Sequence, residues 1–223
     1  MNLLALEFSS PVRSVAVLAA ANRTVTGGLA VSSATDAEAK ERRPLSLVEE
    51  ALTKAATQRE QIEGIVVGLG PGSYTGVRSA IALAQGWELA RKVRVMGLGS
   101  ADCLAAGAQA RGWLGKINVV IDAQRGEVYC AEYEIDAAGF RLVQPLRLLS
   151  IDEARRNSSG LVVGPEVDRW FEGGRVLVPE AEALGRLAIG RDDWTRSEKV
   201  EPIYLRATSF VKAPPARVLP DEG

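Results

Sequence analysis

Two carboxylates stand where an α/β fold could use them for chemistry. Glu7 closes the apolar run Leu3–Leu6, and Asp122 closes the apolar run Ile117–Ile121. Each run is typical of a buried strand, and α/β folds place ligands at the carboxyl ends of such strands. Two carboxylates that face each other across a cleft could hold Mg²⁺ and the phosphates of a nucleotide. Glu7 and Asp122 are therefore the candidate residues of a nucleotide site.

A purely structural role is the alternative for both acids. The first would accept hydrogen bonds from the turn that follows it, at Ser9 and Ser10. The second would accept them from its own turn, at Arg125 and Gly126. That second turn offers one glycine and a bulky arginine, which is poor for cradling phosphate through backbone N–H groups. The structural role is therefore favoured.

A glycine-rich loop over residues 68–73 is the second candidate. It follows the β-branched run Ile65–Val67 and precedes a helix predicted at 74–91, an order that points helix N–H groups at an anion or at a close partner. Its spacing matches neither a P-loop nor a dinucleotide-binding fingerprint. The alternative is a strand-to-helix turn with Ser73 or Thr75 as the N-cap. The candidate residues of this loop are Gly70, Pro71, Gly72, Ser73, Thr75, Gly76 and Arg78.

The sequence contains no histidine among its 223 residues. This excludes a histidine general base, a Ser-His-Asp or Cys-His nucleophile and every histidine-ligated metal site. The two cysteines, Cys103 and Cys130, lie in apolar surroundings without metal-ligand spacing, so we expect buried free thiols and no metal site. The net charge of −1 gives no indication of direct nucleic-acid binding by bulk electrostatics.

The amino-terminal residues indicate a compartment. They lack the basic lead of a signal peptide and reach an acid as early as Glu7. No uncharged apolar run is long enough to span a membrane. We therefore expect a soluble cytoplasmic protein with no membrane association.

Two predicted helices in the first half carry apolar and small residues on more than one face. One is predicted at 44–57, with Pro44 in its first turn, and the other at 74–91. Gly86 in the middle of the second helix costs about 1 kcal/mol relative to alanine. Either these helices pack only within the chain, or one face meets another protein. The residues that would form that partner interface are Leu45, Val48, Leu52, Ala80, Leu83, Ala84 and Trp87.

The order of the predicted elements repeats along the chain. A strand ending in an acid, two further strands and a helix occur around Glu7 and again around Asp122. In the first copy we predict the third strand at 24–30 and a polar loop at 32–43. The repeat predicts a duplicated α/β fold with two mixed-sheet halves. We place the halves at 1–100 and 101–210, followed by a loose carboxyl-terminal tail at 211–223.

Four segments together resemble the TsaB family, also called YeaZ. Leu69–Arg78 (LGPGSYTGVR) resembles the family's loop signature, and Leu3–Ser10 its opening strand and turn. Ile121–Tyr129 resembles the start of the family's second half, and Tyr204–Arg206 its closing motif. The resemblance covers most of the chain, and the loop signature is the most specific part. This sequence departs from the family in carrying Glu7 where aspartate is usual, and in a shortened, proline-rich carboxyl terminus.

The resemblance implies a fold and a role. The fold would be two RNase-H-like halves, as in the actin, hexokinase and Hsp70 superfamily. The family is a non-catalytic paralogue of TsaD, whose two metal-binding histidines are absent here. It implies a scaffold that activates TsaD in attaching a threonylcarbamoyl group to the anticodon-adjacent adenosine of tRNA. The first two helices would bind TsaD, or a second copy when the protein is alone, and the ATPase TsaE would join the complex.

The same resemblance bears on cofactors and on the alternatives. ATP would be used by the partner complex, tRNA would be met only indirectly, and Glu7 and Asp122 would be at most a vestigial nucleotide site. The alternative function is an ATP-dependent small-molecule kinase of the same superfamily, which would need both acids. An older metallopeptidase label attached to relatives of the family is not supported by a chain without histidine.

Overall fold

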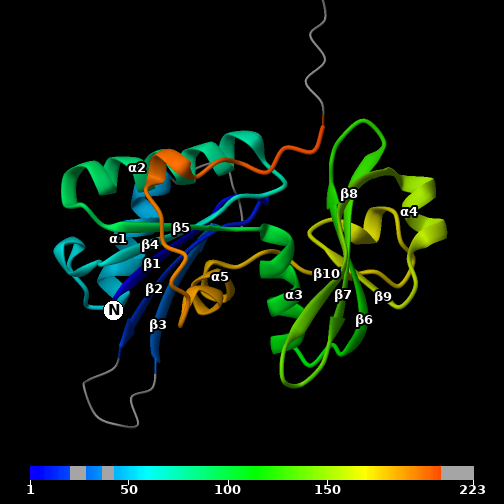
Figure 1. The fold of residues 1–223 in the computed structure, drawn as a ribbon, viewed down its shortest axis with the longest axis horizontal. Helices are drawn as coiled ribbons and strands as arrows, with labels where there is room; N and C mark the ends of the chain where they lie inside the picture. Colours follow the sequence, from blue (N-terminus) through cyan, green and yellow to red (C-terminus); the bar gives the residue numbers. More distant parts are fainter. Residues whose placement is uncertain (21–28, 37–42, 207–223) are drawn as a thin grey trace, which may run out of the picture.

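The computed structural model describes residues 1–20, 29–36 and 43–206 (Figure 1). The described chain forms two five-stranded sheets that stand side by side, with helices packed around the first sheet and between the two. The strands of the first sheet are β1 (Leu3–Glu7), β2 (Arg13–Ala20), β3 (Leu29–Asp36), β4 (Gly64–Gly68) and β5 (Arg94–Leu98). Those of the second are β6 (Gly115–Asp122), β7 (Glu127–Ile135), β8 (Phe140–Ser150), β9 (Leu161–Gly164) and β10 (Arg175–Val176).

The first sheet has the order β3-β2-β1-β4-β5. The pairs β1–β2 and β2–β3 are antiparallel, whereas β4 and β5 run parallel to β1. β1 and β4 lie in the centre, and every residue of both is buried. Burial on both faces is the physical reason that these two strands read as unbroken apolar runs in the sequence.

The second sheet repeats the first, with the order β10-β9-β6-β7-β8. β6 takes the place of β1, the antiparallel strands β7 and β8 take the places of β2 and β3, and the parallel strands β9 and β10 follow. Glu7 and Asp122, the last residues of β1 and β6, therefore occupy equivalent positions. The duplicated RNase-H-like fold predicted from the sequence is confirmed.

The helices do not divide between the halves as the strands do. α1 (Pro44–Lys54) and α2 (Tyr74–Arg91) pack on one face of the first sheet, and α3 (Ser100–Ala110) packs on the second sheet. α5 (Ala181–Ala188) follows the second sheet in sequence, yet it packs against β1 and β2. α4 (Ile151–Asn157) closes the outer side of the second half. A division at residue 100 therefore separates the sheets but not the helices that cover them.

Two predicted boundaries in the first half are wrong. The helix predicted at 44–57 ends at Lys54, because Ala55 is its C-cap and Ala56 has a φ of 48°. The third strand, predicted at 24–30, is found at Leu29–Asp36, where a polar loop had been expected. Residues 21–28 and 37–42, with the rest of those two predictions, and the tail at 211–223 lie outside the described residues. The helix at 74–91 is found with the predicted bounds.

The two cysteines are free and buried, as predicted. Burial raises the pKa of both thiols, so neither is an activated nucleophile. No helix in the described part of the chain is long and apolar enough to cross a membrane.

Candidate functional site

The glycine-rich loop packs directly on the turn between β1 and β2. A Cβ atom on Gly72 would lie 2.1 Å from the carbonyl oxygen of Ser9, and one on Gly76 would lie 1.9 Å from that of Phe8. The Ser73 N–H donates to the Ser9 carbonyl oxygen over 2.6 Å. These contacts leave no room for side chains at either glycine. The close partner that the loop was predicted to meet is therefore the chain's own β1–β2 turn.

The remaining loop residues fix the start of α2 and the start of α3. The Ser73 hydroxyl accepts a hydrogen bond from the Gly76 N–H over 3.2 Å, so Ser73 is the N-cap of α2 and the exposed Thr75 is not. The carbonyl oxygen of Gly70, which has a φ of 81°, accepts from the N–H of Ser100 over 2.8 Å. Pro71 is buried between these two anchors. The loop is thus a joint that ties two helices to one sheet.

Glu7 is fully buried beneath this joint. One carboxylate oxygen accepts from the Ser9 N–H over 2.8 Å and the other from the Ser100 hydroxyl over 2.9 Å. Ser10, the other partner expected, instead donates its hydroxyl proton to a backbone carbonyl oxygen. A Cβ atom on Gly68 would lie 2.1 Å from the Glu7 carboxylate, so a glycine on β4 makes space for it. Burial raises the pKa of Glu7 above its ordinary value of 4.5, although the hydrogen bonds oppose this.

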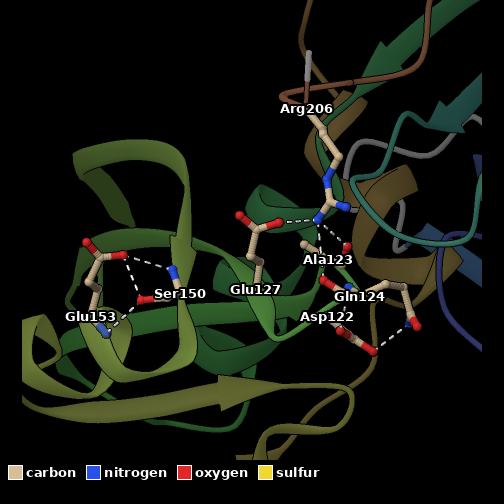
Figure 2. Close-up of polar contacts among 7 residues, drawn as sticks. All are labelled: Asp122, Ala123, Gln124, Glu127, Ser150, Glu153 and Arg206. Atoms are coloured by element: carbon tan, nitrogen blue, oxygen red, sulfur yellow. Dashed lines mark hydrogen bonds and ion pairs between the residues drawn. The ribbon is translucent and has the colours of Figure 1, made fainter. Parts of the chain in front are cut away.

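Asp122 holds its own turn, through a partner that differs from the predicted ones. Its carboxylate accepts from the N–H of Gln124 over 2.7 Å and from the side-chain amide of Gln124 over 2.6 Å, as Figure 2 shows. Gln124, Arg125 and Gly126 have φ values of 63°, 60° and 77° in succession. A left-handed conformation costs a residue other than glycine about 1–2 kcal/mol. The turn is therefore strained and needs the contacts that hold it.

A cavity of about 390 Å³ lies between the two halves. Asp122 lines it and Glu7 does not, so the two carboxylates do not face each other across the cleft as the nucleotide hypothesis required. No lysine or arginine is among its lining residues in the described chain. The same described residues contain no group of three or more Cys, Asp or Glu side chains that could hold a metal ion. The cavity is lined by Ser9, Ser10, Pro11, Gly72, Ser73, Tyr74, Ile121, Asp122, Ala123, Gln124, Tyr129, Pro165 and Glu166.

The predicted partner interface divides into a buried part and an exposed part. Four of its residues, Val48, Leu52, Ala80 and Ala84, are at most 3% exposed and belong to the core beneath α1 and α2. Their helical spacing reflects packing on the sheet, so placing them on a partner surface was wrong. The other three lie at the surface. Leu45 is 54% exposed, and Leu83 and Trp87 are partly buried.

These three residues line a surface hollow of about 370 Å³, which we call the α2 hollow. Three small residues at a spacing of four, Ala82, Gly86 and Ala90, also line it. A Cβ atom on Gly86 would meet nothing within 4 Å. The sequence analysis missed these three small residues and named the buried Ala80 and Ala84 instead. Their spacing of four residues was the feature of the sequence that could have identified them. The α2 hollow is lined by Leu45, Arg59, Glu60, Ala82, Leu83, Gly86, Trp87, Ala90 and Arg91.

This geometry defines a class of protein. Its members have two RNase-H-like halves, and here a cavity lies between the halves and a hollow lies on the second helix. Residues 20–200 match the family model described as "TsaD: tRNA N6-adenosine threonylcarbamoyltransferase". The chain is 31% identical over 183 residues to the tRNA threonylcarbamoyladenosine biosynthesis protein TsaB of Escherichia coli, covering 74% of this chain and 79% of that protein. It is 30% identical to the TsaB of Haemophilus influenzae over 97% of this chain and 98% of that one.

Solved structures agree with the sequence relatives. YeaZ from Pseudomonas aeruginosa superposes with a TM-score of 0.75 at 27% identity, covering 92% of this chain and 99% of that one. A second Pseudomonas aeruginosa structure, described as an uncharacterized protein with similarity to peptidase YeaZ, gives 0.76 at 26% identity, with the same coverage. The chain belongs to the TsaB (YeaZ) family.

The two glycines of α2 predict opposite effects of the same substitution. Gly76→Ala places a methyl group against the fixed Phe8 carbonyl, so we expect a loss of about 2–3 kcal/mol in the free energy of unfolding. Gly86→Ala meets nothing and removes the helix penalty of glycine, so we expect a gain of up to about 1 kcal/mol. Urea unfolding of the two variants measures both, each serving as the control for the other. Equal effects of the two substitutions would contradict the packing described here.

Glu7 predicts a pH dependence of stability. Because the folded state holds the Glu7 proton to a higher pH than the unfolded state does, its contribution is fully present below pH 4.5 and is lost as pH rises through the folded pKa. Glu7→Gln keeps an acceptor for Ser9 and a polar group for Ser100 but does not titrate. We expect the stability of the natural chain to fall relative to Glu7→Gln above pH 4.5, by at most about 1.4 kcal/mol per pH unit. A difference that stays constant from pH 4 to 8 would contradict the buried position of this carboxyl.

Proposed function

We propose that this chain is a subunit of the bacterial machinery that forms threonylcarbamoyladenosine in tRNA. In this proposal it binds the TsaD-type transferase through the α2 hollow and supplies no catalytic group itself. The names of its TsaB relatives, which describe biosynthesis of that nucleoside, support the pathway. The match to a TsaD family model supports kinship with the proposed partner.

The observation that carries the docking surface is Gly86. A glycine in the middle of an 18-residue helix weakens that helix by about 1 kcal/mol relative to alanine. The other glycine of α2, Gly76, is explained by packing within the chain, because it lies against the Phe8 carbonyl. Nothing in the described chain occupies the space over Gly86. With Ala82 and Ala90 one turn to either side, the missing side chain leaves a groove that admits the backbone of a partner helix at close range.

The neighbouring tryptophan supports the same surface. The Nε1 atom of Trp87 is buried and has no acceptor in the described part of the chain. An unpaired buried N–H costs about 1–3 kcal/mol. Trp87 also lines the α2 hollow, so a shift of its ring as a partner packs there would let this N–H reach an acceptor. Leu45 and Leu83 would provide apolar contact on either side of it.

The interlobe cavity supports docking over kinase chemistry. Phosphoryl transfer depends on cations that neutralise the transferring group. No arginine or lysine lines the cavity in the described chain, and Asp122 is held by its turn. The sequence offers no histidine to act as a base or metal ligand. The kinase alternative therefore has less support than the scaffold.

Substitutions in the α2 hollow should weaken binding of TsaD without unfolding the chain. We expect Gly86→Leu and Leu83→Asp each to weaken binding at least ten-fold, about 1.4 kcal/mol, because one fills the groove and the other places a charge in it. Ala110→Leu introduces the same side chain at an exposed position of α3 in the second half and is the control. Calorimetry with purified TsaD measures affinity, and gel filtration of the chain alone measures self-association through the same surface. Unchanged affinity in both variants would refute the assignment.

Reconstitution tests the role itself. We expect TsaD, TsaE, ATP, tRNA and an activated threonylcarbamoyl donor to form the modified nucleoside far faster with this chain than without it, and the chain alone to show no turnover. The chain alone should give no calorimetric heat with ATP and Mg²⁺ and no hydrolysis of a peptide substrate. Saturable ATP binding that is lost in Asp122→Asn would favour the kinase alternative, and metal-dependent peptide hydrolysis would favour a peptidase.

A further inference from the structure

The segment Pro202–Arg206 crosses from one half of the molecule to the other. It leaves the core of the first half at Val200, which is 7% exposed. The Ile203 N–H then donates to the carbonyl oxygen of Leu69 over 2.9 Å, which lays the segment along the glycine-rich loop. Figure 1 shows the end of the described chain running from α2 toward the second half.

An aromatic cluster holds the segment to the first half. The ring of Tyr204 packs on that of Tyr74, with the ring centroids 5.6 Å apart. Arg78 lies over the Tyr74 ring at 4.3 Å, and its Nε–H donates to the Tyr204 hydroxyl over 3.2 Å. This is the structural use of Arg78, the last candidate residue of the loop signature. Two tyrosines and one arginine thus anchor the segment at the start of α2.

Arg206 holds the segment to the second half. Its Nη2 atom donates to the carbonyl oxygens of Ala123 over 2.9 Å and Gln124 over 3.3 Å, and it is paired with the Glu127 carboxylate (Figure 2). Both carbonyls belong to the turn with successive positive φ values. The Asp122 carboxylate accepts a hydrogen bond from the same turn, at the Gln124 N–H. One guanidinium therefore stabilises the wall of the cavity that the second half contributes.

The segment lies at the edge of the interlobe cavity. A smaller cavity of about 120 Å³ is lined by residues of both the segment and the loop, and it shares Gly72, Tyr74 and Tyr129 with the interlobe cavity. Within the described residues the chain also crosses between the halves at 98–100, before α3, and at 177–180, before α5. Pro202–Arg206 is a third crossing, at the cleft. Tyr204 and Leu205 are 50% and 41% exposed, so the segment can leave without opening a core.

We infer that Pro202–Arg206 is an interlobe latch. It joins the two halves at the edge of the cleft, sets the width of the cavity between them, and positions the Ala123–Glu127 turn through Arg206. Its release opens the cleft by rotation of the halves about the other two crossings. This inference does not depend on the partner or the reaction proposed above.

Release of the latch can be measured without activity. Spin labels on Gln85→Cys and Gln144→Cys, two exposed positions in the first and second halves, report the distance between the halves. We expect Arg206→Ala and Tyr204→Ala each to broaden and lengthen that distance distribution. Hydrogen exchange at residues 122–127 should rise at least ten-fold in Arg206→Ala. Arg206→Lys, which keeps the charge beside Glu127 but replaces the Nη2 donor by a shorter ammonium group, should fall between.

Two controls separate a latch from a local brace. Arg186→Ala removes an exposed ion pair within α5 and should change neither readout. Tyr204→Phe keeps the ring packing and loses only the hydroxyl, so it should leave the distance distribution close to that of the natural chain. An unchanged distance distribution in both Arg206→Ala and Tyr204→Ala would overturn the latch, even if exchange in the turn increased.

Discussion

The close contact between the β1–β2 turn and the start of α2 is the constraint on which the rest of the structure depends. The carbonyl oxygens of Phe8 and Ser9 point at positions where only glycine fits, at Gly76 and Gly72. That contact sets the height of α2 over the sheet and thereby the core beneath it. The same contact closes the floor of the cavity above Glu7. The Glu7 carboxylate is enclosed there by backbone and by Gly68 on β4. The glycine-rich loop before α2, whose place between a strand and a helix could suit an anion, instead packs against the protein's own backbone.

The duplication makes the difference between the two acids informative. Glu7 and Asp122 end equivalent strands, yet one is buried with a raised pKa and the other lies at the cavity in a strained turn. The first half encloses its acid by glycine contacts, whereas in the second half Gln124 donates to the acid and Arg206 donates to the carbonyl oxygens of the turn that follows it. Neither acid is left free for chemistry, and no cation in the described lining balances them. The two sheets still place the acids at equivalent strand ends, but the two side chains do not face each other across the cavity.

Sequence reasoning predicted what depends on local pattern and missed what depends on packing between elements. The apolar runs gave the central strands, and Ser73 with the small-residue run gave the bounds of α2. β3 was misplaced because the glycine pair at residues 27 and 28 resembles a bulge, and polar residues at 32–36 do not resemble a strand. The exchange of α5 onto the first sheet leaves no local signal, since its apolar face is the same whichever sheet it covers. For the same reason, periodicity could not separate Val48 and Ala80 in the core from Leu45 and Leu83 at the hollow.

The two glycines of α2 differ in whether packing inside the chain explains them. Gly76 has a reason inside the chain, because a fixed carbonyl oxygen stands where its side chain would be. Gly86 weakens the same helix and gains no contact from doing so within the described residues. In natural sequences, residues that weaken their own secondary structure tend to lie at functional sites. A destabilising glycine that no contact within the chain explains is therefore a candidate for a contact with a partner. The small residues on either side line the same hollow as Trp87, whose buried indole N–H has no partner in the described chain. The surface that local energetics does not explain is the one that we propose for the partner.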